Sequence, residues 1–99
     1  MRFKGRRDDN HDTIRKAFQD MGCTVWDTAD LGCGAPDMVV GVTGLVNELV
    51  EVKDGSKPPS RRQLTPDEQE FHRDWRGRAP VIVESEQDAI DLVNRCRRS

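Results

Sequence analysis

The fold is decided by residues 36–53, which read PDMVVGVTGLVNELVEVK. Two valine-rich runs flank a break that contains Gly41, Thr43 and Gly44, and β-branched residues at this density favour strands. The glycines in the break predict a turn, so the two strands should form an antiparallel hairpin. This hairpin is the expected centre of a small sheet.

Three charged residues of the predicted hairpin should lie close together. Side chains in a strand alternate between two faces, so Glu51 and Lys53 should share one face while the valines beside them point to the other. A turn in the middle of the stretch would place Asp37 opposite Val50 or Glu51. Two carboxylates and an ammonium should then meet at one end of the sheet, above an apolar underside.

Such a cluster has the chemistry of a site for a hard divalent cation. Mg²⁺ prefers oxygen ligands and usually keeps several waters, so two carboxylates, a backbone carbonyl and a substrate phosphate can complete its coordination. Mg²⁺ or Mn²⁺ neutralises charge that develops on a phosphate. Lys53 would orient the attacking water or stabilise the transition state. The predicted reaction class is metal-assisted phosphodiester hydrolysis.

Pro36-Asp37 and Glu51-Val52-Lys53 resemble the two halves of the signature of the PD-(D/E)XK nuclease superfamily. The sequence is more similar to the small phage and prophage proteins of the VRR-NUC type, which are themselves similar to Holliday junction resolvases. That closer likeness extends to residues 54–60 (DGSKPPS), residues 64–66 (LTP), Gln69 and Trp75. It covers most of the chain, from about Asp9 to Val93.

The resemblance implies a Mg²⁺- or Mn²⁺-dependent DNA endonuclease that cuts branched DNA such as Holliday junctions and acts as a homodimer. Its implied metal ligands are Asp37, Glu51 and the backbone carbonyl of Val52, with Lys53 as the catalytic cation. Gln69 resembles a glutamine that relatives place near the metal. Asp12 stands near a position where the phage proteins can contribute a glutamate, although aspartate is one methylene shorter.

Plainer interpretations remain open for these residues. An aspartate before a strand and a Glu-x-Lys on an edge strand also occur as solvated surface charges. Asp12 would serve equally to complement the dipole of a first helical turn, and Gln69 would serve as an exposed helical side chain. Competing functions are a nickase or flap-type nuclease on the same scaffold, and a nucleic-acid-binding module without hydrolysis. The presence of Asp37, Glu51 and Lys53 together argues against the last of these.

The rest of the chain predicts three helices and two further strands. The strongest signal is Thr65-Pro66 with Glu68, which matches a capping box with proline at the first helical position. A strand that follows this helix should lie parallel to its neighbour. The expected elements are a helix from Asp9 or Asn10 to Gly22, a strand at 23–26, the hairpin, a helix from 66 toward 77, a buried strand at 81–83 and a helix capped by Ser85.

These elements predict an α/β fold in which a small mixed sheet is flanked by helices in the order α-β-β-β-α-β-α. That is the restriction-endonuclease-like core which the resemblance implies. With 99 residues, of which 34% are hydrophobic and 34% charged, the chain should form one domain with a modest core. A modest core mildly favours an oligomer.

Basic residues provide candidate DNA contacts. Lys57, Arg61 and Arg62 follow the hairpin, and arginine and lysine neutralise phosphates on binding. Residues 1–8 should form a flexible basic tail. The net charge of −2 permits nucleic-acid binding but does not indicate it.

The cysteines predict neither a zinc site nor a cysteine nucleophile. Three widely spaced cysteines, without a Cys-x-x-Cys pair or a nearby histidine, do not suit a zinc site. Cys33 lacks an evident general base and should be a loop residue rather than a nucleophile. Reduced thiols, no signal peptide and no membrane-spanning stretch suggest a cytoplasmic location, in a bacterial host of the phage or prophage that the resemblance implies.

Overall fold

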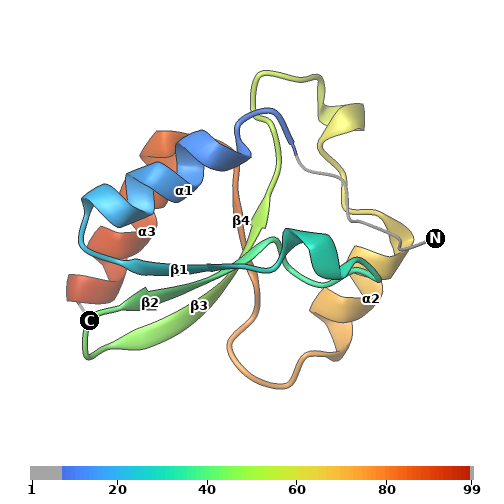
Figure 1. Ribbon diagram of the computed structural model, residues 1–99. Coiled ribbons are helices and arrows are strands. Elements are labelled where there is room, and N and C mark those ends of the chain that lie inside the picture. Colours follow the sequence, from blue (N-terminus) through green and yellow to red (C-terminus); the bar gives the residue numbers. More distant parts are fainter. Residues whose placement is uncertain (1–7, 99) are drawn as a thin grey trace.

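A four-stranded mixed sheet carries the fold in the computed structural model, which describes residues 8–98 (Figure 1). The strands lie in the order β1-β2-β3-β4; β1, β2 and β3 pair antiparallel, and β3 pairs parallel with β4. The elements are α1 (His11–Asp20), β1 (Thr24–Asp27), β2 (Met38–Val42), β3 (Val46–Val52), α2 (Pro66–Asp74), β4 (Val81–Val83) and α3 (Glu86–Arg98), with short 3₁₀ turns at Ala29–Leu31 and Pro59–Arg61. The predicted fold class, element order and parallel pairing of the last strand are confirmed.

The central hairpin has the expected antiparallel pairing, with Met38 opposite Val50. Continuing this register by one residue places Asp37 opposite Glu51. The turn itself is shorter than expected: Gly44 adopts a φ of 67°, and Leu45 N donates to the Val42 carbonyl at 2.9 Å. Gly41 was wrongly assigned to the turn. It lies within β2, because one residue with positive φ is enough to reverse the chain.

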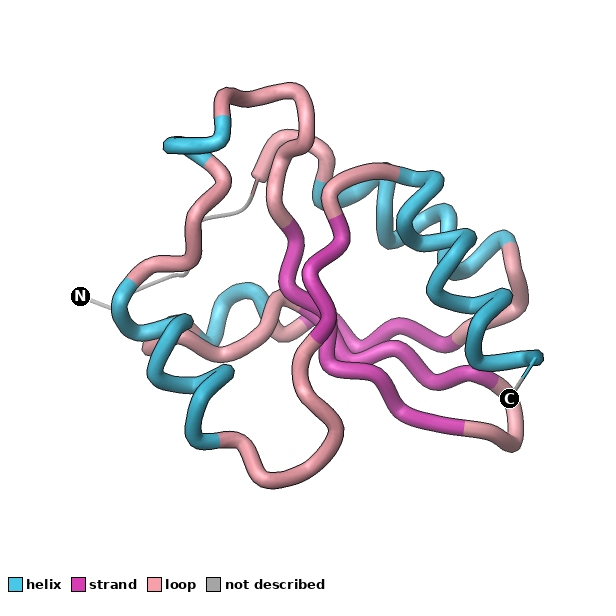
Figure 2. The backbone as a smooth tube through the Cα atoms, turned by 180° about the vertical axis from the view of Figure 1, so that it is seen from behind, coloured by secondary structure: helices cyan, strands magenta, loops and turns pink. Residues whose placement is uncertain are grey.

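The core lies between one face of the sheet and the pair of helices α1 and α3. Figures 1 and 2 show these two helices side by side on that face. Alternate residues of β2 and β3 are buried against them, as the period of two requires. The core consists chiefly of Ile14, Phe18, Met38, Val40, Val42, Val50, Val52, Val83, Leu92 and Val93. The predicted apolar underside of the sheet is thus confirmed.

Asn10 joins the start of α1 to the end of the sheet. It occupies the N-cap position, but its side-chain amide donates to the backbone carbonyls of Lys53, at 3.2 Å, and Glu84, at 3.1 Å. These carbonyls follow β3 and β4. The beginning of α1 is therefore fixed beside the ends of the two strands that carry the predicted site.

The capping box that begins α2 is confirmed. Thr65 Oγ1 accepts from Glu68 N at 3.2 Å, and Glu68 Oε1 accepts from Thr65 N at 2.9 Å. The helix ends at Asp74, earlier than expected, because the backbone of Trp75 is extended. Figure 1 shows α2 apart from α1 and α3. The start of α2 lines the same pocket as Asp37 and Glu51.

Two strand assignments need correction. β1 begins at Thr24 and ends at Asp27, one residue later than expected at each end. β4 is an edge strand rather than a buried one: it has a neighbour on one side only, and Ile82 is 43% exposed, whereas Val83 is fully buried in the core. No helix within residues 8–98 is long and apolar enough to cross a membrane.

Candidate active site

Asp37 is held rigidly at the mouth of β2. Its backbone N donates to the Val50 carbonyl at 2.9 Å, and its carbonyl accepts from Thr28 N at 2.9 Å. Its carboxylate Oδ2 accepts from Val52 N at 2.7 Å. With both backbone and side chain bound, Asp37 has little rotational freedom, which is what preorganisation of a site requires.

The contact with Val52 also orients a carbonyl. In a strand, the N–H and C=O of one residue point toward the same neighbour, and Val52 N points to Asp37. The Val52 carbonyl therefore faces the same side of β3 as the Asp37 carboxylate. The three ligands implied by the resemblance meet at this end of the hairpin.

Glu51 is the most deeply buried acid of the group, with a side chain that is 1% exposed. Burial raises its pKa far above the ordinary value, and the neighbouring carboxyls of Asp37 and Glu68 raise it further. Its Oε1 atom has no hydrogen-bond partner among residues 8–98. A carboxyl in this position is protonated unless a cation compensates its charge.

Lys53 makes a short ion pair with Glu68, at 2.7 Å between Nζ and Oε1. Both side chains are largely buried. Burial alone would lower the pKa of Lys53, but the hydrogen bond and charge of Glu68, followed by the charges of Glu51 and Asp8, raise it. For Glu68 the signs are reversed: burial alone would raise its pKa, but the hydrogen bonds from Lys53 and from Thr65 N lower it. Both partners are therefore charged.

His72 from α2 covers the other side of Glu51. Its Nε2 lies 3.5 Å from Glu51 Oε1, too far for a hydrogen bond, and it has no hydrogen-bond partner among the described residues. Burial lowers the pKa of His72, which keeps the imidazole neutral near pH 7. A neutral imidazole completes the wall around Glu51 without adding charge.

Asp37, Glu51, Lys53 and Glu68 line one open pocket of about 370 Å³, of which His72 is not a lining residue. The walls include Asp37, Glu51 and Lys53 from the hairpin, and Thr65, Asp67 and Glu68 from the start of α2, with Asp8 before α1 and the loop at 32–35. Asp8 was assigned to the tail by sequence; it is half-buried, and burial raises its pKa, with smaller effects from Lys53 and Asp37. The other tail residues, 1–7, lie outside the described part of the chain.

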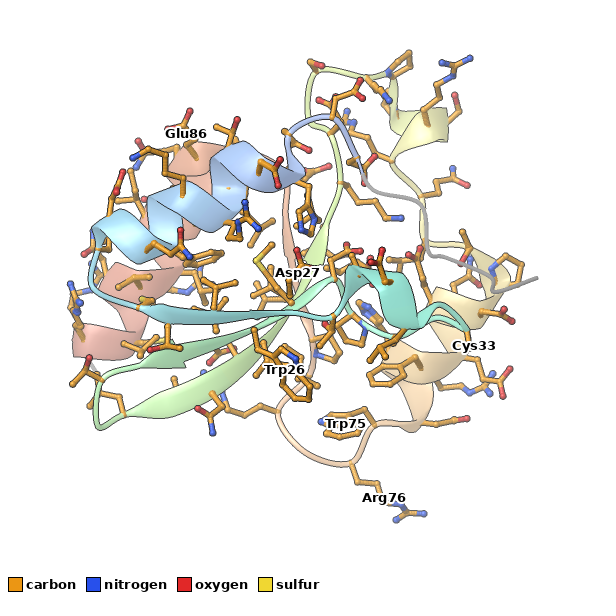
Figure 3. The ribbon with its side chains drawn as sticks, viewed as in Figure 1. Trp26, Asp27, Cys33, Trp75, Arg76 and Glu86 are labelled. Carbon is orange, nitrogen blue, oxygen red and sulfur yellow. The ribbon has the colours of Figure 1, made fainter. Side chains whose placement is uncertain are left out.

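The loop at 32–35 can approach α2 closely because residue 34 is a glycine, which has no side chain. Gly34 has a φ of 81°, and a Cβ at this position would collide with the backbone carbonyl of Asp67. Cys33, beside it, is exposed at the rim of the pocket, where Figure 3 shows it facing α2. The expectation that Cys33 is a loop residue agrees with this position.

Two predicted contributors lie outside the pocket. The Gln69 amide donates to the Leu64 carbonyl at 3.0 Å, on the exposed side of α2. Asp12 has a side chain that is 77% exposed and pairs with Arg15 at 3.3 Å. Their plainer interpretations, an exposed helical side chain and an acid in a first helical turn, match these positions.

The candidate DNA contacts divide into two kinds. Lys57 and Arg61 line a second hollow of about 460 Å³, which shares Lys53, Asp8 and Thr65 with the pocket. Arg62 does not line this hollow and pairs with Glu84 at 3.1 Å, and Lys57 also pairs with an acid, Asp9, at 3.8 Å. The two basic residues that border the pocket through this hollow are Lys57 and Arg61.

The donor set suits a hard cation with an incomplete protein shell. Within residues 8–98, no three His, Cys, Asp or Glu side chains are placed to hold a metal ion together. Two carboxylates and one carbonyl do not require a third side chain, since Mg²⁺ keeps waters and takes phosphate oxygens. The three cysteines, Cys23, Cys33 and Cys96, are free thiols.

Glu68, His72 and Asp8 were missed as site residues. Glu68 was recognised only as a helix cap, and neither His72 nor Asp8 carries a local signal. In comparisons with known proteins, no family model, no curated protein and no solved structure matches the chain.

Proposed function

We propose that this protein hydrolyses phosphodiester bonds in DNA with the help of Mg²⁺ or Mn²⁺. One observation carries the proposal: Asp37 and Glu51 lie opposite each other where the hairpin register is continued by one residue, and both line the same pocket as Lys53. Buried acids grouped in this way are costly to a fold, and strongly shifted pKa values gather at functional sites.

The residues present fit a divalent cation. Deprotonation of Glu51 in its buried position requires nearby positive charge, and a cation between Asp37 and Glu51 would supply it. Asp37, Glu51 and the Val52 carbonyl would hold the ion. When bound, the ion would neutralise charge that develops on the phosphate.

The chain's own residues would then orient the reaction. Lys53 lies within the same pocket and stays charged, so it would donate hydrogen bonds to a phosphate oxygen or to the attacking water. Asp37 is locked by Val52 N and would hold its oxygen in place without reorganisation. The pocket is open to solvent on one side, which leaves room for a polymeric substrate.

DNA is the proposed substrate because basic side chains extend the pocket. Lys57 and Arg61 border the adjoining hollow, where they would neutralise neighbouring phosphates of a bound strand. The resemblance to VRR-NUC proteins supports branched DNA, such as a four-way junction, as the preferred structure. It also supports a homodimer, in which two pockets would act on two strands.

The test is cleavage of a labelled four-way junction beside linear, single-stranded and flap DNA, in Mg²⁺, Mn²⁺ or EDTA. Lys53→Ala is the inactive control. We expect metal-dependent paired nicks near the junction that are absent in the control. Cleavage of flaps or linear DNA instead would retain the chemistry and reject the junction. No cleavage of any substrate by folded protein would reject the enzyme and leave the nucleic-acid-binding module.

A further inference from the structure

The Glu68 carboxylate caps α2 and also makes an ion pair with Lys53. Its Oε1 atom accepts from Thr65 N at 2.9 Å, which completes the capping box of α2, and from Lys53 Nζ at 2.7 Å. The same carboxylate therefore joins the first turn of a helix to the residue that follows β3. A helix cap alone does not require a lysine, so the second contact calls for a reason.

The position of the Lys53 ammonium matters because it has several acidic neighbours. Besides Glu68, the charges of Glu51 and Asp8 act on it. An ammonium free to move on its flexible stem would be drawn onto Glu51 or Asp37 and would occupy the place of a cation there. Something must hold it aside if those two acids are to bind metal.

We propose that Glu68 is a positioning residue, whose carboxylate holds the Lys53 ammonium off Asp37 and Glu51 and so keeps these two acids open to a divalent cation. This inference rests on the proposed function. Two observations favour positioning over a role as a third ligand. Glu68 Oε1 is already occupied by two donors, and no three acidic or histidine side chains in residues 8–98 are placed to share an ion.

The geometry explains why Glu68 is suited to this role. Its carboxylate is anchored by Thr65 N, and Glu68 N is in turn held by Thr65 Oγ1 at 3.2 Å. The acceptor is therefore fixed to the helix, whereas the lysine side chain is the flexible partner. Charge-assisted hydrogen bonds of this length are strong enough to select one lysine position.

The experiment measures Mn²⁺ affinity by calorimetric titration in the wild type, Glu68→Gln, Lys53→Met and the double variant, with one further variant as a control. Glutamine keeps an oxygen for Thr65 N, so α2 should remain capped. Glu70→Gln is the matched control, because it removes a carboxylate from the same helix at a position that does not line the pocket.

We expect Glu68→Gln to weaken Mn²⁺ binding about 10- to 100-fold, the loss typical of residues that orient metal ligands. Glu70→Gln should bind like the wild type. In the Lys53→Met background, adding Glu68→Gln should not weaken Mn²⁺ binding further, because no ammonium is left to occupy the site. The double variant should therefore bind Mn²⁺ with the same affinity as Lys53→Met.

Two results would overturn the inference alone. Wild-type affinity in Glu68→Gln would mean that Glu68 is only a cap, and a loss that persists in the double variant would mean that Glu68 acts on the ion directly. A second readout needs no metal: in EDTA, the stability changes of Glu68→Gln and Lys53→Met must be non-additive, and additivity would refute the contact. Absence of Mn²⁺ binding by the wild type would instead refute the proposed function, and the inference with it.

Discussion

Glu51 stands at the centre of the site, and burying an acid there has a cost that can be measured. Its pKa in the folded protein lies above its ordinary value of 4.5. As pH rises above that value, the unfolded chain loses the proton first while the folded protein keeps it. The metal-free protein should therefore lose stability with rising pH.

Glu51→Gln should reverse this loss. The amide is neutral at every pH, so in EDTA at pH 8 the variant should be more stable than the wild type by at least about 1 kcal/mol, since one pKa unit corresponds to about 1.4 kcal/mol. At pH 4 the difference should be smaller. Urea unfolding at both pH values measures it, and a wild type that is the more stable protein at pH 8 would contradict the predicted charge cost.

Asp37 provides the second prediction for a single residue. Mn²⁺ at 100 times its Kd should stabilise the wild type by about 2.7 kcal/mol if it binds only the folded state. Asp37→Ala should lose this rise in Tm. Asp37→Asn keeps an oxygen for Val52 N and should fold as well as the wild type, yet it should also lose most of the rise. Equal rises in all three proteins would reject Asp37 as a ligand.

At the scale of elements, the loop before β2 and the start of α2 are joined by a close approach at Gly34. Gly34→Ala forces a Cβ onto the Asp67 carbonyl and also strains a positive φ. Gly44→Ala is the matched control: its φ is 67°, and a Cβ there meets nothing within 4 Å. We expect Gly44→Ala to cost about 1 kcal/mol and Gly34→Ala clearly more, by urea unfolding. Equal costs would show that the loop can move away from α2 freely.

The elements themselves were predictable, but their contacts across the sequence were not. Valine density and one positive-φ glycine define the hairpin, and Thr65-Pro66 with Glu68 defines the start of α2, because these signals are local. The pairing of Glu68 with Lys53 depends on where α2 sits against the sheet, which no local pattern encodes. Likewise the resemblance alone made Asp12 a candidate, whereas Asp8, four residues earlier and before α1, lines the pocket.

At the scale of the whole molecule, one face of the sheet is only partly covered. α1 and α3 cover the other face, and Trp26 projects from β1 on the side away from them (Figure 3). Trp26 lies opposite Val39, which lies opposite Leu49, so this row shares a face with Asp37 and Glu51. The site is thus built at the edge of an open apolar surface on which Trp26 is 66% exposed.

An apolar surface of this kind is where a second copy of the chain would pack, if the proposed homodimer forms. Trp26→Ser should then shift the protein from dimer toward monomer in sedimentation velocity measured over a range of concentrations. Leu45→Ser is the control, because Leu45 is 52% exposed on the hairpin turn, outside the row of Trp26, Val39 and Leu49. It should leave the dimer intact. A wild type that stays monomeric at every concentration would reject the dimer and confine each protein molecule to one cut.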